Sequence, residues 1–146
     1  MTTRFTAAQS RSILASNAQM SCAVADALHD SDVPPKRQSM CLELAARLYA
    51  DGWFDHPASS NPTGLVFEQE VIDLQARAAF KKGISCGIIP GGLFGVVRWF
   101  AARQIAWYFL KKLIKNWWLA ERATTQRLLA EHRAESDPQS PPYLES

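Results

Sequence analysis

The chain has 146 residues, of which 47% are hydrophobic and 21% are charged, and its formal net charge at pH 7 is +2. This length suits about one domain, and the hydrophobic content excludes an intrinsically disordered chain. The charge is unevenly divided. Residues 1–75 hold five Arg/Lys against nine Asp/Glu, giving −4, whereas residues 76–122 hold nine Arg/Lys against one Glu, giving +8. Such a basic block predicts an anionic partner, which could be a lipid surface, nucleic acid or an acidic protein face.

The first predicted helix covers residues 6–28. Its apolar residues recur at helical spacing and include Ile13, Met20, Val24 and Leu28. The chain before Asp26 contains Arg4, Arg11 and many Ser and Thr, but no acid, which is also the composition of a mitochondrial presequence. We favour an ordinary N-terminal helix, with an uncleaved import signal as the alternative.

Two further helices are predicted in the acidic part of the chain. Residues 31–35, which end in a proline pair, are predicted to break the chain and start the second helix, with Asp32 as its cap. This helix is expected to end near residue 50 at the stop signal Asp51-Gly52. A loop rich in Pro, Ser and Asn follows at residues 53–64, and the third helix covers residues 65–82. Residues 1–82 are therefore predicted to form an acidic three-helix portion.

Residues 83–97 form an apolar segment of fifteen residues without a charge. Glycine recurs in it at every fourth position, at Gly83, Gly87, Gly91 and Gly95. On a membrane helix, such a stripe lets neighbouring backbones approach closely. The run Pro90-Gly91-Gly92 is equally typical of a turn between two helices. The sequence leaves both interpretations open, a glycine-packed membrane helix and an apolar hinge.

One long helix is expected after this segment, because no strong helix breaker occurs between residues 93 and 135. At 1.5 Å per residue it would measure roughly 65 Å, more than one small core can cover. Such a helix must project from its domain, lie on a surface or pass through one. Residues 98–135 make up its basic and aromatic part, and the proline-containing tail at residues 136–146 is expected to be extended.

Residues 98–122 are strongly amphipathic, with Trp, Phe and Leu on one face and Lys on the other. This composition is typical of helices that lie in a membrane interface. Together with the four glycines, the residues predicted to pack in the membrane or against a partner are Trp99, Trp107, Tyr108, Trp117 and Trp118. The residues predicted to contact lipid phosphates are Arg98, Arg103, Lys111, Lys112 and Lys115.

Other interpretations of this amphipathic helix compete with membrane contact. Its apolar face could pack on the rest of its own domain. Nucleic-acid binding is disfavoured, because the aromatic residues form one large face and do not alternate with the cations. A membrane span over residues 83–102 would have the right length, but it contains Arg98 and Pro90 and would need protein neighbours.

The sequence carries no constellation typical of an enzyme. It lacks a phosphate-binding glycine loop with its lysine, a dinucleotide-binding motif and a HExxH motif. Cys22, Cys41 and Cys86 do not have metal-ligand spacing and are expected to be buried or half-buried free thiols in a reducing compartment. No catalytic residue, cofactor, metal site or small-molecule substrate is therefore predicted.

The arrangement of residues 80–135 resembles small accessory subunits of mitochondrial ATP synthase and respiratory complexes. The shared pattern is a glycine-spaced apolar segment, a basic and aromatic turn, and a long charged helix. The resemblance implies an all-α, non-catalytic, membrane-associated subunit of a larger assembly, with other subunits and anionic lipid as partners and the mitochondrial inner membrane as a location. The alternative is a soluble scaffolding or virion protein whose Trp-rich helix packs against partner chains.

Overall fold

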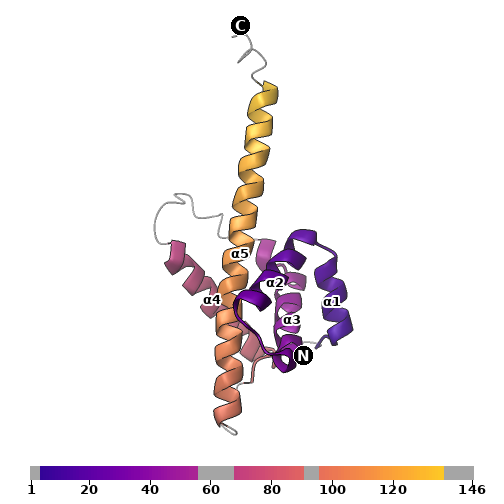
Figure 1. Ribbon diagram of the computed structural model, residues 1–146, viewed down its shortest axis with the longest axis vertical. Coiled ribbons are helices and arrows are strands. Elements are labelled where there is room, and N and C mark those ends of the chain that lie inside the picture. The colour runs from indigo at the N-terminus through magenta and orange to yellow at the C-terminus, as the bar shows by residue number, and fades with distance from the viewer. Residues whose placement is uncertain (1–3, 56–67, 91–95, 137–146) are drawn as a thin grey trace.

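The computed structural model describes residues 4–55, 68–90 and 96–136, apart from the side chains of Glu68, Ser136 and residues 96–100. Within these ranges the chain is all-helical, as predicted, with no strand. Figure 1 shows one long helix, α5, running the length of the molecule, with α1, α2 and α3 on one side of it and α4 on the other.

The predicted first helix is in fact two helices, α1 (Ala7–Ala15) and α2 (Ala18–Asp30). The prediction of a single helix was wrong because side chains at the break compete for backbone groups. The Ser16 hydroxyl donates to the Ile13 carbonyl at 2.6 Å, and Asn17 caps α2 by accepting from the Met20 amide at 2.9 Å. The break lets α2 cross to α5 while α1 stays on α3.

Helix α3 (Pro35–Ala50) begins in the predicted proline pair and ends where the sequence predicted. The predicted cap was wrong, because the N-cap is Pro34 and Asp32 lies in the preceding turn with a φ of +54°. Pro35 occupies its first turn, where a missing backbone N–H costs nothing. Gly52 follows its C-terminus with a φ of +76°, a left-handed conformation that favours glycine. The chain then forms the single turn η1 (Trp53–Asp55), which buries Phe54. The remaining part of the predicted loop, residues 56–64, lies outside the described residues.

Helix α4 (Glu68–Ser85) extends three residues beyond its predicted end, and its predicted start at residues 65–67 lies outside the described residues. Its C-terminus is closed by backbone hydrogen bonds. The amides of Ile88 and Ile89 both donate to the Gly83 carbonyl, at 3.0 and 3.1 Å, while Gly87 adopts a φ of +81°. The chain therefore turns here instead of continuing as one helix.

Helix α5 (Val96–Ser136) has 41 residues, or about 60 Å at 1.5 Å per residue, and agrees with the predicted long helix. Its first half packs on α2, α3 and α4, and its second half projects beyond them (Figure 1). One hydrophobic core joins all five helices. The completely buried side chains at its centre are Met20, Leu44, Leu48, Ile89, Phe109, Leu110 and Leu113.

Candidate functional site

The apolar face of α5 lies inside the molecule. Phe109, Leu110 and Leu113 have no exposed surface, and Trp117 and Trp118 are only 9% and 4% exposed. The Trp117 ring packs against Phe54, with the ring centroids 5.5 Å apart. In this structure these indoles contact the rest of the domain, which was the competing interpretation of the amphipathic pattern, and they are not available to lipid.

The other aromatic residues predicted for an interface have mixed environments. Trp107 is half-buried against Phe80 of α4, with the ring centroids 6.0 Å apart in an edge-to-face arrangement. Tyr108 is exposed. The side chains of Trp99 and Arg98 lie outside the described residues. Among the predicted interface aromatics whose side chains the structure describes, Tyr108 is therefore the one in the exposed class, and Trp107 is half-buried.

The predicted phosphate contacts fall into two groups. Arg103 donates from Nε to the Pro90 carbonyl at 3.1 Å and so holds the turn after α4 against α5. Lys111 pairs with Asp73 of α4, with 3.5 Å between Nζ and Oδ1. Lys112 and Lys115 are exposed. With Lys111, Tyr108, Gln69 and Ile72 they line a shallow pocket of about 210 Å³ between α4 and α5.

The four glycines do not lie on one continuous helix. Gly83 is buried in the last turn of α4, where a Cβ would come within 2.9 Å of Leu44 Cδ1 and 2.6 Å of Ile89 Cδ1. Gly87 lies in the turn that follows. Both serve packing and chain reversal within this domain. Gly91 and Gly95 lie outside the described residues.

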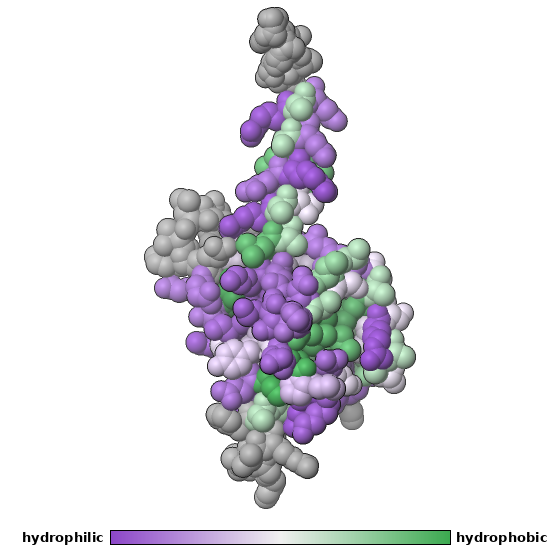
Figure 2. All heavy atoms as spheres, viewed as in Figure 1, coloured by the Kyte–Doolittle hydropathy of each residue, from purple (hydrophilic) through white to green (hydrophobic). Residues whose placement is uncertain are grey.

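In the described part of the chain, the second half of α5 is the longest helical stretch that contributes no side chain to the hydrophobic core. Every residue from Thr125 to Glu135 is exposed. Leu119, Leu128 and Leu129 expose 46%, 53% and 54% of their surface. Figure 2 shows that this part of the molecule is a rod that stands clear of the body and carries both hydrophobic and hydrophilic side chains. We call Leu119–Ser136 the projecting half of α5.

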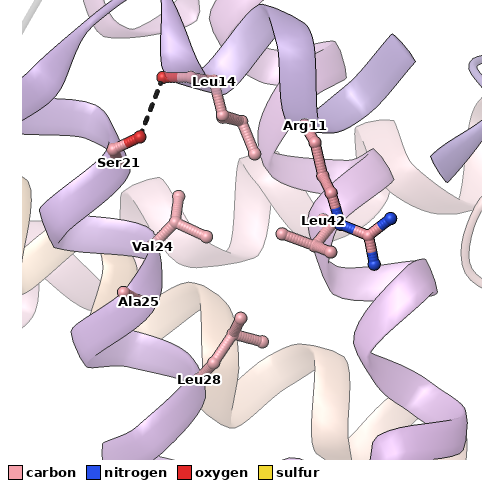
Figure 3. A pocket seen from close by; sticks show the side chains of 7 residues that line it. All are labelled: Arg11, Leu14, Ser21, Val24, Ala25, Leu28 and Leu42. Atoms are coloured by element: carbon pink, nitrogen blue, oxygen red, sulfur yellow. Dashed lines mark hydrogen bonds between the residues drawn. The ribbon is translucent and has the colours of Figure 1, made fainter. Parts of the chain in front are cut away.

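A second feature, which was not predicted from the sequence, is an apolar groove where α1, α2 and α3 meet (Figure 3). Leu14 and Arg11 come from α1, Leu42 from α3, and Ser21, Val24, Ala25 and Leu28 from α2. The groove has a volume of about 240 Å³. The groove cannot be predicted from the periodicity of the sequence, because the groove depends on how three helices are placed relative to one another.

An ion pair between two residues that are far apart in sequence, Arg4 and Glu43, holds the segment before α1 against α3. Arg4 donates from Nε and Nη2 to the two Glu43 carboxylate oxygens at 2.6 and 2.9 Å, and from Nη1 to the Gly87 carbonyl at 2.8 Å. The Phe5 amide also donates to Glu43, at 3.0 Å. Burial alone would raise the pKa of Glu43, but the hydrogen bonds from Arg4 and Phe5 outweigh it and lower that pKa below its ordinary value.

Within the described ranges the chain has neither a metal-binding cluster nor a membrane-spanning helix. No group of three or more His, Cys, Asp or Glu side chains is placed to hold a metal ion. None of the described helices combines the length and apolar character that a membrane crossing requires. Cys22, Cys41 and Cys86 are free thiols. Cys41 is buried and Cys86 is half-buried, as predicted, but Cys22 is exposed because it lies on the outer face of α2.

Comparisons of this chain with models of protein families, with curated proteins and with solved structures gave no match. The function is therefore inferred from the residues and their geometry.

Proposed function

We propose that this protein is a non-catalytic structural subunit of a larger assembly, which it joins through the projecting half of α5. The observation that carries the proposal is the exposure of Leu119, Leu128 and Leu129 on a helix that leaves its own core. The first half of α5 is an anchor, since it is packed on three other helices. The second half is then presented to a partner at a fixed position and direction.

The distribution of the exposed leucines indicates the kind of partner. At 100° per residue, Leu119, Leu128 and Leu129 lie at about 0°, 180° and 280° around the helix axis. No single flat groove can cover all three directions. A partner that buries them must surround the helix, as two or more helices do when they accept another helix between them. Charged residues near the leucines, among them Arg127 and Glu131, would set its register.

Photo-crosslinking tests this proposal. Leu128 is replaced by the photo-crosslinking residue benzoylphenylalanine, and the full chain is expressed in its native source. We expect one discrete protein adduct, which disappears in a variant that also carries Leu119→Asp and Leu129→Asp. The matched control places the same crosslinker at Leu74, an α4 residue that is 62% exposed. An absence of adduct at residue 128, or the same adducts at residues 74 and 128, would contradict the proposal.

A second candidate role for the same subunit is attachment to an anionic membrane surface. The observation that favours it is the group of three lysines on one side of α5, where Lys112 and Lys115 are exposed beside the exposed Tyr108. Each basic residue near an anionic leaflet contributes about 1 kcal/mol. Because the apolar face of α5 is buried, this attachment would be electrostatic and would weaken as salt screens it.

Flotation with liposomes tests the membrane role. Wild-type protein should float with vesicles that contain phosphatidylserine, should not float with neutral vesicles, and should be released by high salt. Lys112→Glu with Lys115→Glu should abolish flotation, whereas Arg77→Glu, an exposed change on α4, should weaken it less. Flotation that resists both salt and the lysine changes would contradict an electrostatic attachment. A mitochondrial inner-membrane location remains a prediction, which fractionation of the native source and carbonate extraction would check.

A further inference from the structure

The groove between α1, α2 and α3 is apolar across its floor and carries a cation at its edge. Figure 3 shows Leu14, Val24, Leu28 and Leu42 around the opening, with the Arg11 guanidinium next to Leu42. Leu14 and Val24 are buried, while Leu28 and Leu42 are half-buried and remain reachable. The Ser21 hydroxyl already donates to the Leu14 carbonyl at 3.2 Å, so no unsatisfied donor sits on the floor.

A second hollow lies next to the groove along α2. Ala25 and Leu28 line both, and the second hollow has a volume of about 400 Å³. It ends at the polar side chains of His29, Asp32 and Gln38. The two hollows are therefore adjacent over α2, and together we call them the slot, with a cation at its first end and the shared residues Ala25 and Leu28 in its middle. Figure 2 shows hydrophobic side chains gathered on this face of the molecule.

Arg11 is exposed, and no described carboxylate pairs with it. Glu43 of the neighbouring helix α3 is held by Arg4. A guanidinium binds a carboxylate through two parallel hydrogen bonds, and its aliphatic stem tolerates apolar surroundings. The charge at the edge of the slot therefore complements one anionic head group attached to an apolar chain.

We propose that this slot binds a fatty acid, with the carboxylate on Arg11 and the acyl chain over Ala25 and Leu28. A slot that opens into a second hollow suits a flexible chain, which can follow its length. The slot is independent of the projecting half of α5, because its lining residues come from α1, α2, α3 and the turn between α2 and α3. Fatty-acid binding and partner docking can therefore succeed or fail separately.

Calorimetric titration of the full chain with octanoate, decanoate and dodecanoate, each below its micelle concentration, tests the proposal. Each added methylene that is buried should tighten binding about fourfold, until the slot is filled. Dodecanol, which has the same chain and no charge, should bind about tenfold more weakly than dodecanoate. Affinity that does not depend on chain length would overturn the proposal.

Two variants locate the site. Arg11→Gln should weaken dodecanoate about tenfold and leave dodecanol unchanged, whereas Arg77→Gln on α4 should change neither. Ala25→Leu fills the middle of the slot and should abolish binding. Its matched control is Ala18→Leu, a change of the same kind at another exposed position of α2 that does not line the slot. Because Ala25 is exposed, both leucine variants are expected to fold, which thermal unfolding checks.

The remaining outcomes distinguish this site from the docking of a partner. Leu128→Asp with Leu129→Asp should leave dodecanoate binding unchanged even if it abolishes the crosslinked adduct. If dodecanoate does not bind wild-type protein, the proposal is overturned. If Ala25→Leu removes the adduct formed from residue 128 while dodecanoate fails to bind, the slot is a protein-docking groove and the fatty-acid proposal is likewise overturned.

Discussion

At the scale of single residues, the best-defined interactions connect segments that are distant in sequence. Arg4, Glu43 and Gly87 form one hydrogen-bonded group that joins the N-terminus, α3 and the turn after α4. Lys82 of α4 pairs with Asp51 at the end of α3, with 2.9 Å between Nζ and Oδ2. The hydrogen bond from Lys82 lowers the pKa of Asp51. Two carboxylates are therefore held in their ionised form by folding.

The lowered pKa values of Glu43 and Asp51 lead us to expect that the free energy of unfolding depends on pH. Folding lowers the pKa of Glu43 below its ordinary value of 4.5 and that of Asp51 below 3.8. The stabilisation is fully present above the unfolded-state pKa values and is lost as the pH falls through the folded-state values. Urea midpoints should therefore fall when the pH is lowered from neutral to about 3, and Glu43→Gln should reduce this slope. Glu70→Gln, at an exposed position of α4, is the control. An unchanged slope in Glu43→Gln would assign the acid sensitivity to other groups.

The three thiols should differ in reactivity. Burial raises the pKa of Cys41 to about 12, so little thiolate forms at neutral pH and the sulfur is also inaccessible. Cys22 is exposed. Iodoacetamide should label Cys22 first and Cys41 only when the protein unfolds, as peptide mass spectrometry over time would measure. Rapid labelling of Cys41 without denaturant would mean that α3 opens locally.

At the scale of elements, the end of α4 shows how a glycine can be required by packing. An alanine normally stabilises a helix relative to glycine by about 0.5–1 kcal/mol. At Gly83, however, a Cβ would lie 2.6 Å from Ile89 Cδ1 and 2.9 Å from Leu44 Cδ1, and both of these side chains are completely buried. An added methyl group would therefore force these two core side chains to shift.

Gly83→Ala should therefore destabilise the protein by about 1–3 kcal/mol, because overpacking outweighs the helical gain. Urea unfolding monitored by circular dichroism would measure the loss. The control is Ser85→Ala at the exposed end of the same helix, which should change stability by no more than about 0.5 kcal/mol. Increased stability in Gly83→Ala would show that the turn after α4 can relax away from the added methyl group.

At the scale of the whole molecule, α5 has two roles that divide near Leu119. Residues before it complete the core, with Asn116 Nδ2 donating to the Ala23 carbonyl of α2 at 3.4 Å. The Arg122 guanidinium packs over the Trp118 ring, 5.3 Å from its centroid, at the point where α5 leaves the body. From Thr125 to Glu135 every side chain is exposed.

Removal of residues 125–146 should therefore leave the free energy of unfolding unchanged within about 0.5 kcal/mol, since the described residues among them contribute no buried side chain. Thermal and urea unfolding of the truncated and full chains would measure this. Hydrogen exchange of the full chain should be fast at residues 125–135 and slow at residues 106–114. A marked loss of stability on truncation would mean that the projecting half already packs on its own domain.

Local properties of the sequence predicted much of this architecture. Prolines and Asp51-Gly52 set the bounds of α3, and the absence of breakers after residue 96 produced the length of α5. Helix formation depends on residues within a few positions, so these features can be read from the chain directly. The break at Ser16 and Asn17 was missed because the apolar spacing continues across it, although a capping side chain at Asn17 could have indicated it.

The amphipathic pattern of α5 by itself determined that one face would be buried and the other solvated, because apolar surface avoids water wherever it can. It could not determine what buries that face, since lipid, a partner chain and the protein's own core satisfy the same pattern. Only the tertiary structure decided this, by packing α2, α3 and α4 over the aromatic face. The slot beside Arg11 and the solitary second half of α5 were likewise decided by tertiary structure, because both depend on the relative positions of elements far apart in the sequence.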